Sequence, residues 1–236
     1  MLWLPLTFML ARDMPDATHG RELRPKLFLD VVTSPDIPRN VVDRALTEAA
    51  IIWDTVGIEI KPSAIHTAVG RVDATRAVDD AHAITVVVDD EPKTALHNDP
   101  ALGWIGFDAP DRPERRVHLS RRSATVLLDA ISGFGKRPES ERERLIGRAL
   151  GRTLAHEIGH YLLGSKEHTP RGLMRATIAA EDFFSPSRAS FYLECDQATL
   201  AMNRLTFPDR QPRVRKSREP SRPSDAGSST AGRGDE

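Results

Sequence analysis

The sequence predicts an α/β (α+β) domain with a small, mixed, twisted sheet, one long helix and a short, mostly helical C-terminal part. Three observations support this prediction. The chain begins with strand-like and helix-like patterns in alternation, several short β-branched segments follow, and then a long segment carries apolar residues at four-residue spacing. With 236 residues, of which 39% are hydrophobic and 28% charged, the chain can form one globular domain with a substantial core.

The first predicted elements are a strand, a helix and two further strands. Residues 26–33 (KLFLDVVT) are rich in Leu, Phe and Val and read as a strand. Pro38 then opens a helix over about 38–56, because proline favours the first turn of a helix. Residues 58–60 begin a second strand, and the β-branched run at 83–90 (AITVVVDD) is the third.

Two short strands and two helices complete the predicted order. Residues 104–107 and 117–119 form the strands, joined by a polar turn. A long helix follows, for which Ser140 and Glu143 form a predicted capping box, and a final helix covers about 188–205. The apolar side of the long helix carries four residues at four-residue spacing: Leu150, Leu154, Ile158 and Leu162.

We predict a single folded domain over residues 26–205, with a lead-in at 1–25 and a disordered tail at 206–236. The tail is rich in Pro, Ser, Gly and Arg and has too few apolar residues to fold. The lead-in is apolar over residues 2–11, which is too short to span a membrane. It is the remnant of a secretory signal, or else a strand or apolar arm. The first alternative favours an extracytoplasmic location and leaves the cytoplasm open.

Composition narrows the range of partners. The formal net charge is −1, so no overall field selects nucleic acid or a membrane surface, and we expect no nucleic-acid partner. No other segment is apolar over the length of a membrane span. The single cysteine, Cys195, excludes an intrachain disulfide, and we predict that it packs in a helix. The oligomeric state is left open.

The pattern H-E-x-x-H at residues 156–160 carries the chemistry. His156 and His160 lie four residues apart, so on a helix they point about 40° apart and can bind one metal ion. Glu157 projects from the flank of that face, where it can take a proton from a metal-bound water. These residue types favour one catalytic Zn²⁺, and the pattern therefore predicts a zinc-dependent hydrolase.

The segment HEIGHYLLGSKEHTPRGLM resembles the metzincin zinc peptidases, whose pattern is H-E-x-x-H-x-x-G-x-x-H followed by a methionine-containing turn. Gly164 corresponds to the glycine one residue late, and His168 to the third histidine two residues late. Met174 corresponds to the methionine of the turn beneath the metal. The resemblance implies a zincin-like fold, with His168 as the third metal ligand beside His156 and His160.

A second candidate for the third ligand is Glu181. Another class of H-E-x-x-H enzymes takes a glutamate from a later helix, and Glu181 follows His160 at a suitable distance. The sequence favours His168, because the glycine and methionine landmarks accompany it.

The predicted function is that of a zinc metalloendopeptidase, a hydrolase that acts on peptide or protein through Glu157. Two alternatives are a non-catalytic, zinc-stabilised binding module and a small-molecule amide hydrolase. Residues 103–110 (GWIGFDAP) are similar to the edge strand and loop that line the substrate cleft in metzincins. An extended peptide can pair with such an edge through main-chain hydrogen bonds.

Overall fold

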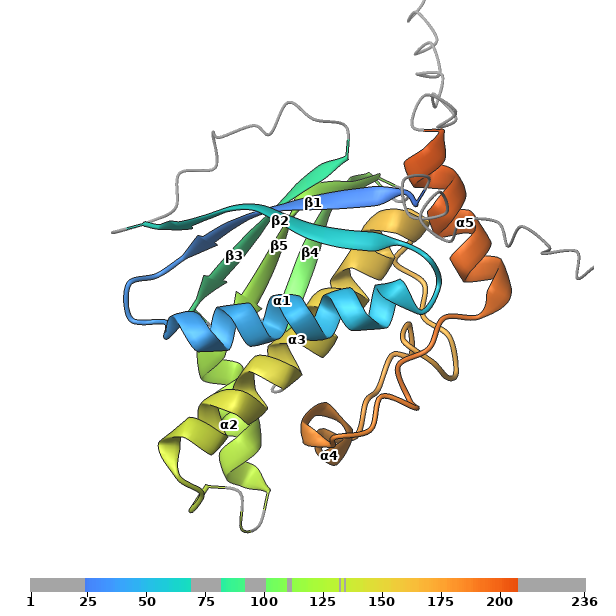
Figure 1. Cartoon of the computed structure of the whole chain (residues 1–236). Coiled ribbons are helices and arrows are strands. Elements are labelled where there is room, and N and C mark those ends of the chain that lie inside the picture. The colour runs from blue at the N-terminus through green and yellow to red at the C-terminus, as the bar shows by residue number, and fades with distance from the viewer. Residues whose placement is uncertain are drawn as a thin grey trace, which may run out of the picture.

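The computed structural model describes residues 24–68, 82–91, 101–109, 112–131, 133 and 135–207. They form a five-stranded mixed sheet, with the long helices α1 and α3 side by side against it (Figure 1). This arrangement confirms the predicted α/β class. The predicted apolar lead-in and polar tail fall mostly on residues 1–23 and 208–236, outside the described residues, so the domain limits stay a prediction.

The sheet has the strand order β2-β1-β3-β5-β4. Strand β1 pairs in parallel with β2 on one side and with β3 on the other, and β3 pairs in parallel with β5. Strand β4 lies at one edge and runs antiparallel to β5. The strands are β1 Lys26–Thr33, β2 Glu59–Thr67, β3 Ala83–Asp89, β4 Gly103–Ala109 and β5 Arg112–Ser120.

Five helices lie within the described residues: α1 Arg39–Asp54, α2 Arg121–Ala130, α3 Glu139–Leu163, α4 Ala180–Phe184 and α5 Cys195–Thr206. Within the described part of the chain, none of them combines the length and apolar character needed to cross a membrane.

Helices α1 and α3 pack closely because glycines of α3 face α1 at the contact. A side chain on Gly151 would come within 2.5 Å of the Glu48 Cβ and 2.6 Å of the Ala45 carbonyl oxygen. The buried Trp53 indole of α1 also donates a hydrogen bond of 3.2 Å to the carbonyl of Ala155 in α3. The close approach fixes the position of α3, whose C-terminal half carries the H-E-x-x-H pattern.

The apolar side of α3 is buried as predicted, but the predicted capping box is wrong. Leu150, Leu154, Ile158 and Leu162 all have no exposed surface. Helix α3 begins after Pro138 without a side-chain cap. The Glu143 carboxylate instead accepts a hydrogen bond of 2.7 Å from Asn40 in α1. A contact across 103 residues therefore takes the place of the local one that the sequence suggested.

The final helix starts at Cys195 rather than near residue 188. A capping box stands at this start: the Glu194 side chain accepts from the third-position N–H, and the Gln197 side chain accepts from the Glu194 N–H at 3.2 Å. The prediction that Cys195 packs is wrong, because its position in the first turn leaves it exposed. Helices α2 and α4 were not predicted, and β2 and β5 extend beyond their apolar stretches because backbone pairing continues through polar residues.

Candidate metal centre

Helix α3 brings His156 and His160 together near its C-terminal end. Four residues correspond to slightly more than one turn, so both side chains leave the helix on neighbouring sides. Their ring centroids are 4.7 Å apart and the rings are nearly perpendicular, at 82°. The part of α3 that carries both side chains is mostly buried in the core, which restricts changes in their spacing.

Backbone carbonyls fix the protonation of both rings. The Nδ1 atom of His156 lies 2.8 Å from the Leu173 carbonyl oxygen, and Nδ1 of His160 lies 2.7 Å from the Ser165 carbonyl oxygen. A carbonyl can only accept, so each Nδ1 carries the hydrogen and donates it. In a neutral ring the other nitrogen, Nε2, is then an unprotonated lone pair, which is the form that binds a metal.

The two Nε2 atoms face each other at 3.0 Å. Burial lowers the pKa of His156 to about 4 and also lowers the pKa of His160. Both rings are therefore neutral at pH 7. The lone pairs of the two Nε2 atoms face each other with no hydrogen between them. Such a pair is repulsive unless a cation lies between the two nitrogens.

His168 completes a group of three histidines. Gly164 ends α3 in the left-handed conformation, with φ 64° and ψ 32°, and the chain turns back toward the helix. The His168 ring lies 5.3 Å from that of His156 and 4.9 Å from that of His160. One ring nitrogen from each of the three lies within 4.8 Å of the others. Ligand nitrogens of a tetrahedral zinc ion are about 3.3 Å apart, so the group suits such an ion.

Met174 lies against the helix between the two histidines. A side chain on Gly159 would come within 2.2 Å of the Met174 sulfur, so only glycine leaves room for it. The Thr169 N–H donates a hydrogen bond of 2.8 Å to the Met174 carbonyl, which closes the loop that carries His168. The segment that carries Met174 thus packs against the H-E-x-x-H segment itself.

The other predicted residues are distributed as follows. Glu157 is buried in α3, between the two histidines in sequence. Glu181 is exposed in the first turn of α4 and is not part of the histidine group. Tyr161, which directly follows His160, is buried in the core. The structure therefore brings together His168, and not Glu181, with the histidines of α3.

Phe107 and Lys166 also lie at the group, and sequence reasoning did not identify them. Phe107, on the edge strand β4, makes an edge contact with His160, with ring centroids 6.3 Å apart. The Lys166 ammonium lies 5.0 Å from the centroid of the Phe107 ring. The motif indicated a site at His160, and the resemblance implied that the strand at 103–110 lines the substrate cleft, but neither identified the contact between Phe107 and His160.

No protein-family model and no curated protein sequence matches the chain. Several solved structures resemble it, among them the following two. The archaemetzincin from Methanopyrus kandleri is 16% identical with a TM-score of 0.49, and the match covers 77% of this chain and 97% of that one. A zinc-dependent peptidase from Methanocorpusculum labreanum is 11% identical with a TM-score of 0.47, over 74% of this chain and 100% of that one. Likenesses at this level are weak and carry no information on the chemistry of the histidine group.

Proposed function

We propose that this chain is a zinc-dependent peptidase that cleaves peptide bonds within a chain. His156, His160 and His168 would hold one Zn²⁺, and Glu157 would act as the general base and acid. One observation carries the proposal: two neutral histidines, each with its hydrogen committed to a carbonyl, turn their lone pairs toward each other at 3.0 Å. A third histidine beside them gives a set of three neutral nitrogen ligands, which is typical of catalytic zinc.

A bound zinc ion would supply Lewis-acid chemistry, both by polarising the scissile carbonyl and by lowering the pKa of a water molecule. The Leu173 and Ser165 carbonyls keep the two helical rings in the tautomer that leaves Nε2 free. Glu157 would take a proton from the attacking water and pass it to the departing amine. This division of roles follows from position, because Glu157 lies on the flank of the helix face that carries the two ligands.

Edge strand β4 supports a peptide as the substrate. In the described sheet β4 pairs with β5 on one side only, so its other edge can bind an extended chain through main-chain hydrogen bonds. Phe107 of this strand contacts the His160 ring. A peptide added to β4 would therefore run past the histidine group, as hydrolysis of a bond within the chain requires.

The test compares wild type with Glu157→Gln, and uses Glu181→Gln as a matched control for loss of a carboxylate outside the group. Zinc content is measured together with cleavage of a quenched peptide library. We expect one zinc per chain in all three proteins, and cleavage by wild type and Glu181→Gln only. Full cleavage by Glu157→Gln would remove the proposed mechanism. Zinc in every protein with no peptide cleavage would favour a binding module or a small amide substrate, and absence of zinc would refute the metal centre.

A further inference from the structure

We propose that Arg152 is a positioning residue for His156: together with Glu48 it holds the segment 182–192, through which the Leu173 carbonyl is fixed against the His156 ring. The proposal rests on the proposed function, because it treats His156 as a metal ligand. Arg152 lies one helical turn before His156 on α3, yet its guanidinium donates its hydrogen bonds to Glu48, Asp182 and Ser187 rather than to that ring.

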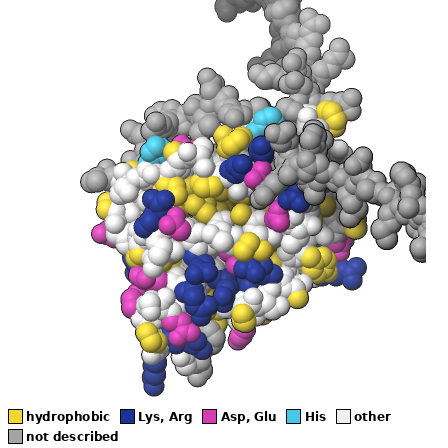
Figure 2. All heavy atoms as spheres, viewed as in Figure 1, with side chains coloured by type: hydrophobic (Ala, Val, Ile, Leu, Met, Phe, Trp, Pro, Cys, Tyr) yellow, Lys and Arg dark blue, Asp and Glu magenta, His cyan; other side chains and the backbone are white. Residues whose placement is uncertain are grey.

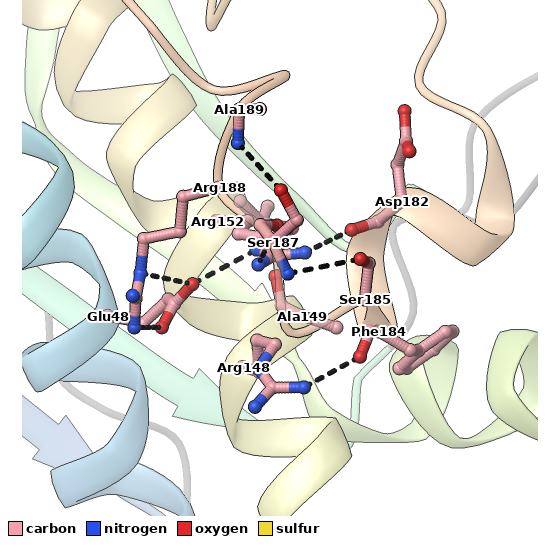
Figure 3. A network of polar contacts seen from close by, with 11 residues as sticks. Glu48, Arg148, Ala149, Arg152, Asp182, Phe184, Ser185, Ser187, Arg188 and Ala189 are labelled. Carbon is pink, nitrogen blue, oxygen red and sulfur yellow. Dashed lines mark hydrogen bonds and ion pairs between the residues drawn. The ribbon is translucent and has the colours of Figure 1, made fainter.

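Arg152 is fully buried, and its guanidinium binds partners from two distant segments. Its Nε donates to the Glu48 carboxylate of α1 at 3.1 Å, across 104 residues. Its Nη1 donates to the Asp182 carbonyl of α4, and its Nη2 donates to the Ser187 carbonyl at 2.7 Å (Figure 3). One side chain of α3 thus holds the backbone of the segment 182–192 at two points.

Glu48 supplies the charge that makes a buried arginine tolerable. Gly151, next to Arg152, lets Glu48 approach, since any larger residue would overlap the Glu48 Cβ. Arg188 grips the same carboxylate with two hydrogen bonds, of 3.0 and 2.6 Å, and closes it off from solvent. Figure 2 shows Lys and Arg side chains gathered on this face, with some Asp and Glu side chains beside them, whereas the Glu48 side chain is buried, with 2% exposure.

The segment 182–192, which Arg152 holds, contacts the side chain of Arg175 next to the methionine turn. The Phe191 ring lies under the Arg152 guanidinium at 4.6 Å, and the Arg175 guanidinium lies 5.5 Å from the same ring. The Arg175 side chain also binds the Asp182 carboxylate at 2.6 Å. Arg175 directly follows Met174, so the methionine turn is tied to both ends of the segment.

Tyr192 and Leu173 make the last two links. The Leu173 N–H donates a hydrogen bond of 2.7 Å to the Tyr192 carbonyl, and the Leu173 carbonyl accepts the His156 Nδ1–H at 2.8 Å. Gly172 permits this approach: its φ is +76°, and a side chain there would come within 2.6 Å of the Tyr192 oxygen. The series of contacts therefore begins at Arg152 of α3 and ends at His156 of the same helix.

A purely stabilising role is a poor explanation for this network. Burying an ion pair costs desolvation energy, and a well-packed apolar pair of similar volume is often equally stable. What the charged network adds is a fixed geometry: three directed bonds from one guanidinium, each with a defined partner. Fixing the carbonyl partner of a metal-binding histidine sets the ring's tautomer and orientation.

The experiment compares Arg152→Met, Arg152→Lys and a control, Arg142→Met. Arg142 is a comparable arginine of α3 with 15% side-chain exposure that binds Asp129 and the Gly135 carbonyl, about 20 Å along the helix from His156. Two quantities are measured. The first is the tautomer of the His156 ring in metal-free protein, from its ¹⁵N chemical shifts, and the second is zinc affinity by competition with a chelator.

In Arg152→Met we expect a fraction of the molecules to carry the His156 hydrogen on Nε2 instead of Nδ1. We also expect the zinc dissociation constant to rise about tenfold, near the lower limit for loss of an outer-shell partner. Arg152→Lys should recover part of both changes, and Arg142→Met should alter neither. A folded Arg152→Met protein with the wild-type tautomer and zinc affinity would overturn the proposal, and would reduce the network to fold stability.

Arg175→Gln covers the case in which Arg152→Met does not fold. It removes the ion pair with Asp182 while leaving the buried charges paired. The proposal predicts the same direction of change in both measurements, and unchanged values would refute it. The tautomer measurement needs no metal. If wild type bound no zinc, the proposed function would therefore be refuted, but the tautomer measurement would still test the positioning role of Arg152.

Discussion

The two histidines of α3 and the histidine of the following loop are held in different ways. His156 and His160 project from a buried helix, and a backbone carbonyl orients each ring at less than 3 Å. His168 is exposed on a loop, and among the described residues no hydrogen bond holds its ring. In the proposed metal centre the helix would therefore provide two ligands that are already in position, whereas the third ligand would come from a loop that has to be ordered at an additional cost in free energy.

The largest expected effect comes from removing ligands of the two kinds. His156→Ala or His160→Ala should abolish stoichiometric zinc binding, because each removes half of the preformed pair. His168→Ala should weaken zinc binding more than about 100-fold, which is the upper end of the loss caused by changes in the outer shell of a metal site. The remaining affinity should still be measurable. Zinc titration against a chelator ranks the three variants.

Glu181→Ala is the matched control for this ranking. It should leave zinc affinity unchanged, because Glu181 is exposed and outside the group. If Glu181→Ala weakened zinc binding more than His168→Ala did, the third ligand would have to be reassigned to the glutamate.

The second effect is a pH dependence of the stability of the metal-free protein, which arises from the two histidines of α3. Burial lowers the pKa of His156 from 6.5 to about 4, so the unfolded chain binds this proton more readily than the metal-free fold does. Stability of the metal-free protein must then fall as the pH falls from 6.5, and the loss is complete below about pH 4. At about 1.4 kcal/mol for each pKa unit, His156 contributes a loss of about 3 kcal/mol.

Denaturant unfolding of metal-free wild type and His156→Gln at several pH values between 7 and 4 measures this contribution. Other titrating groups act in both proteins and cancel in the difference. A difference that stayed constant over this range would mean that His156 is not desolvated, and would remove the distinction between the helix pair and the loop.

The sequence predicted the helix pair more completely than the loop, for a physical reason. Helical spacing is local, so the relative positions of His156 and His160 could be derived from the pattern alone. The choice between His168 and Glu181 depends on how a loop folds back, which no local rule determines. The resemblance to metzincins favoured the residue that the structure brings to the group.

Contacts between distant parts of the chain were beyond sequence reasoning. The carbonyl of Leu173 carries no side-chain signal, and the bond between Arg152 and Glu48 spans 104 residues. Phe107 and His160 meet only because β4 occupies the edge of the sheet next to α3. The strand β1, by contrast, was predicted with its observed limits, since a short run of β-branched and aromatic residues specifies it locally.

A smaller effect is expected where the methionine turn meets the helix. Gly159→Ala would place a methyl group 2.2 Å from the Met174 sulfur, and overpacking of this kind costs about 1–3 kcal/mol. We expect lower thermal stability and weaker zinc binding, because the turn that carries the Leu173 carbonyl must move. Adding Met174→Ala should recover part of both losses, and a double variant no better than Gly159→Ala would show that the two residues do not compete for space.

The smallest effect concerns what holds the loop. The Lys166 ammonium lies 5.0 Å from the Phe107 ring, a cation–π contact that ties the segment 165–168 to β4. At an exposed site this contact is worth about 0.5–1 kcal/mol, so Lys166→Ala should lower zinc affinity about two- to fivefold. Lys136→Ala, an exposed lysine before the opposite end of α3, should change nothing. Lys166 is two residues from His168, and its partner Phe107 contacts the His160 ring, so a change in affinity can reach the proposed metal site through the loop or through Phe107. An unchanged affinity would mean that His168 reaches the metal without support from β4, and that the short turn between Gly164 and Met174 is sufficient to place it.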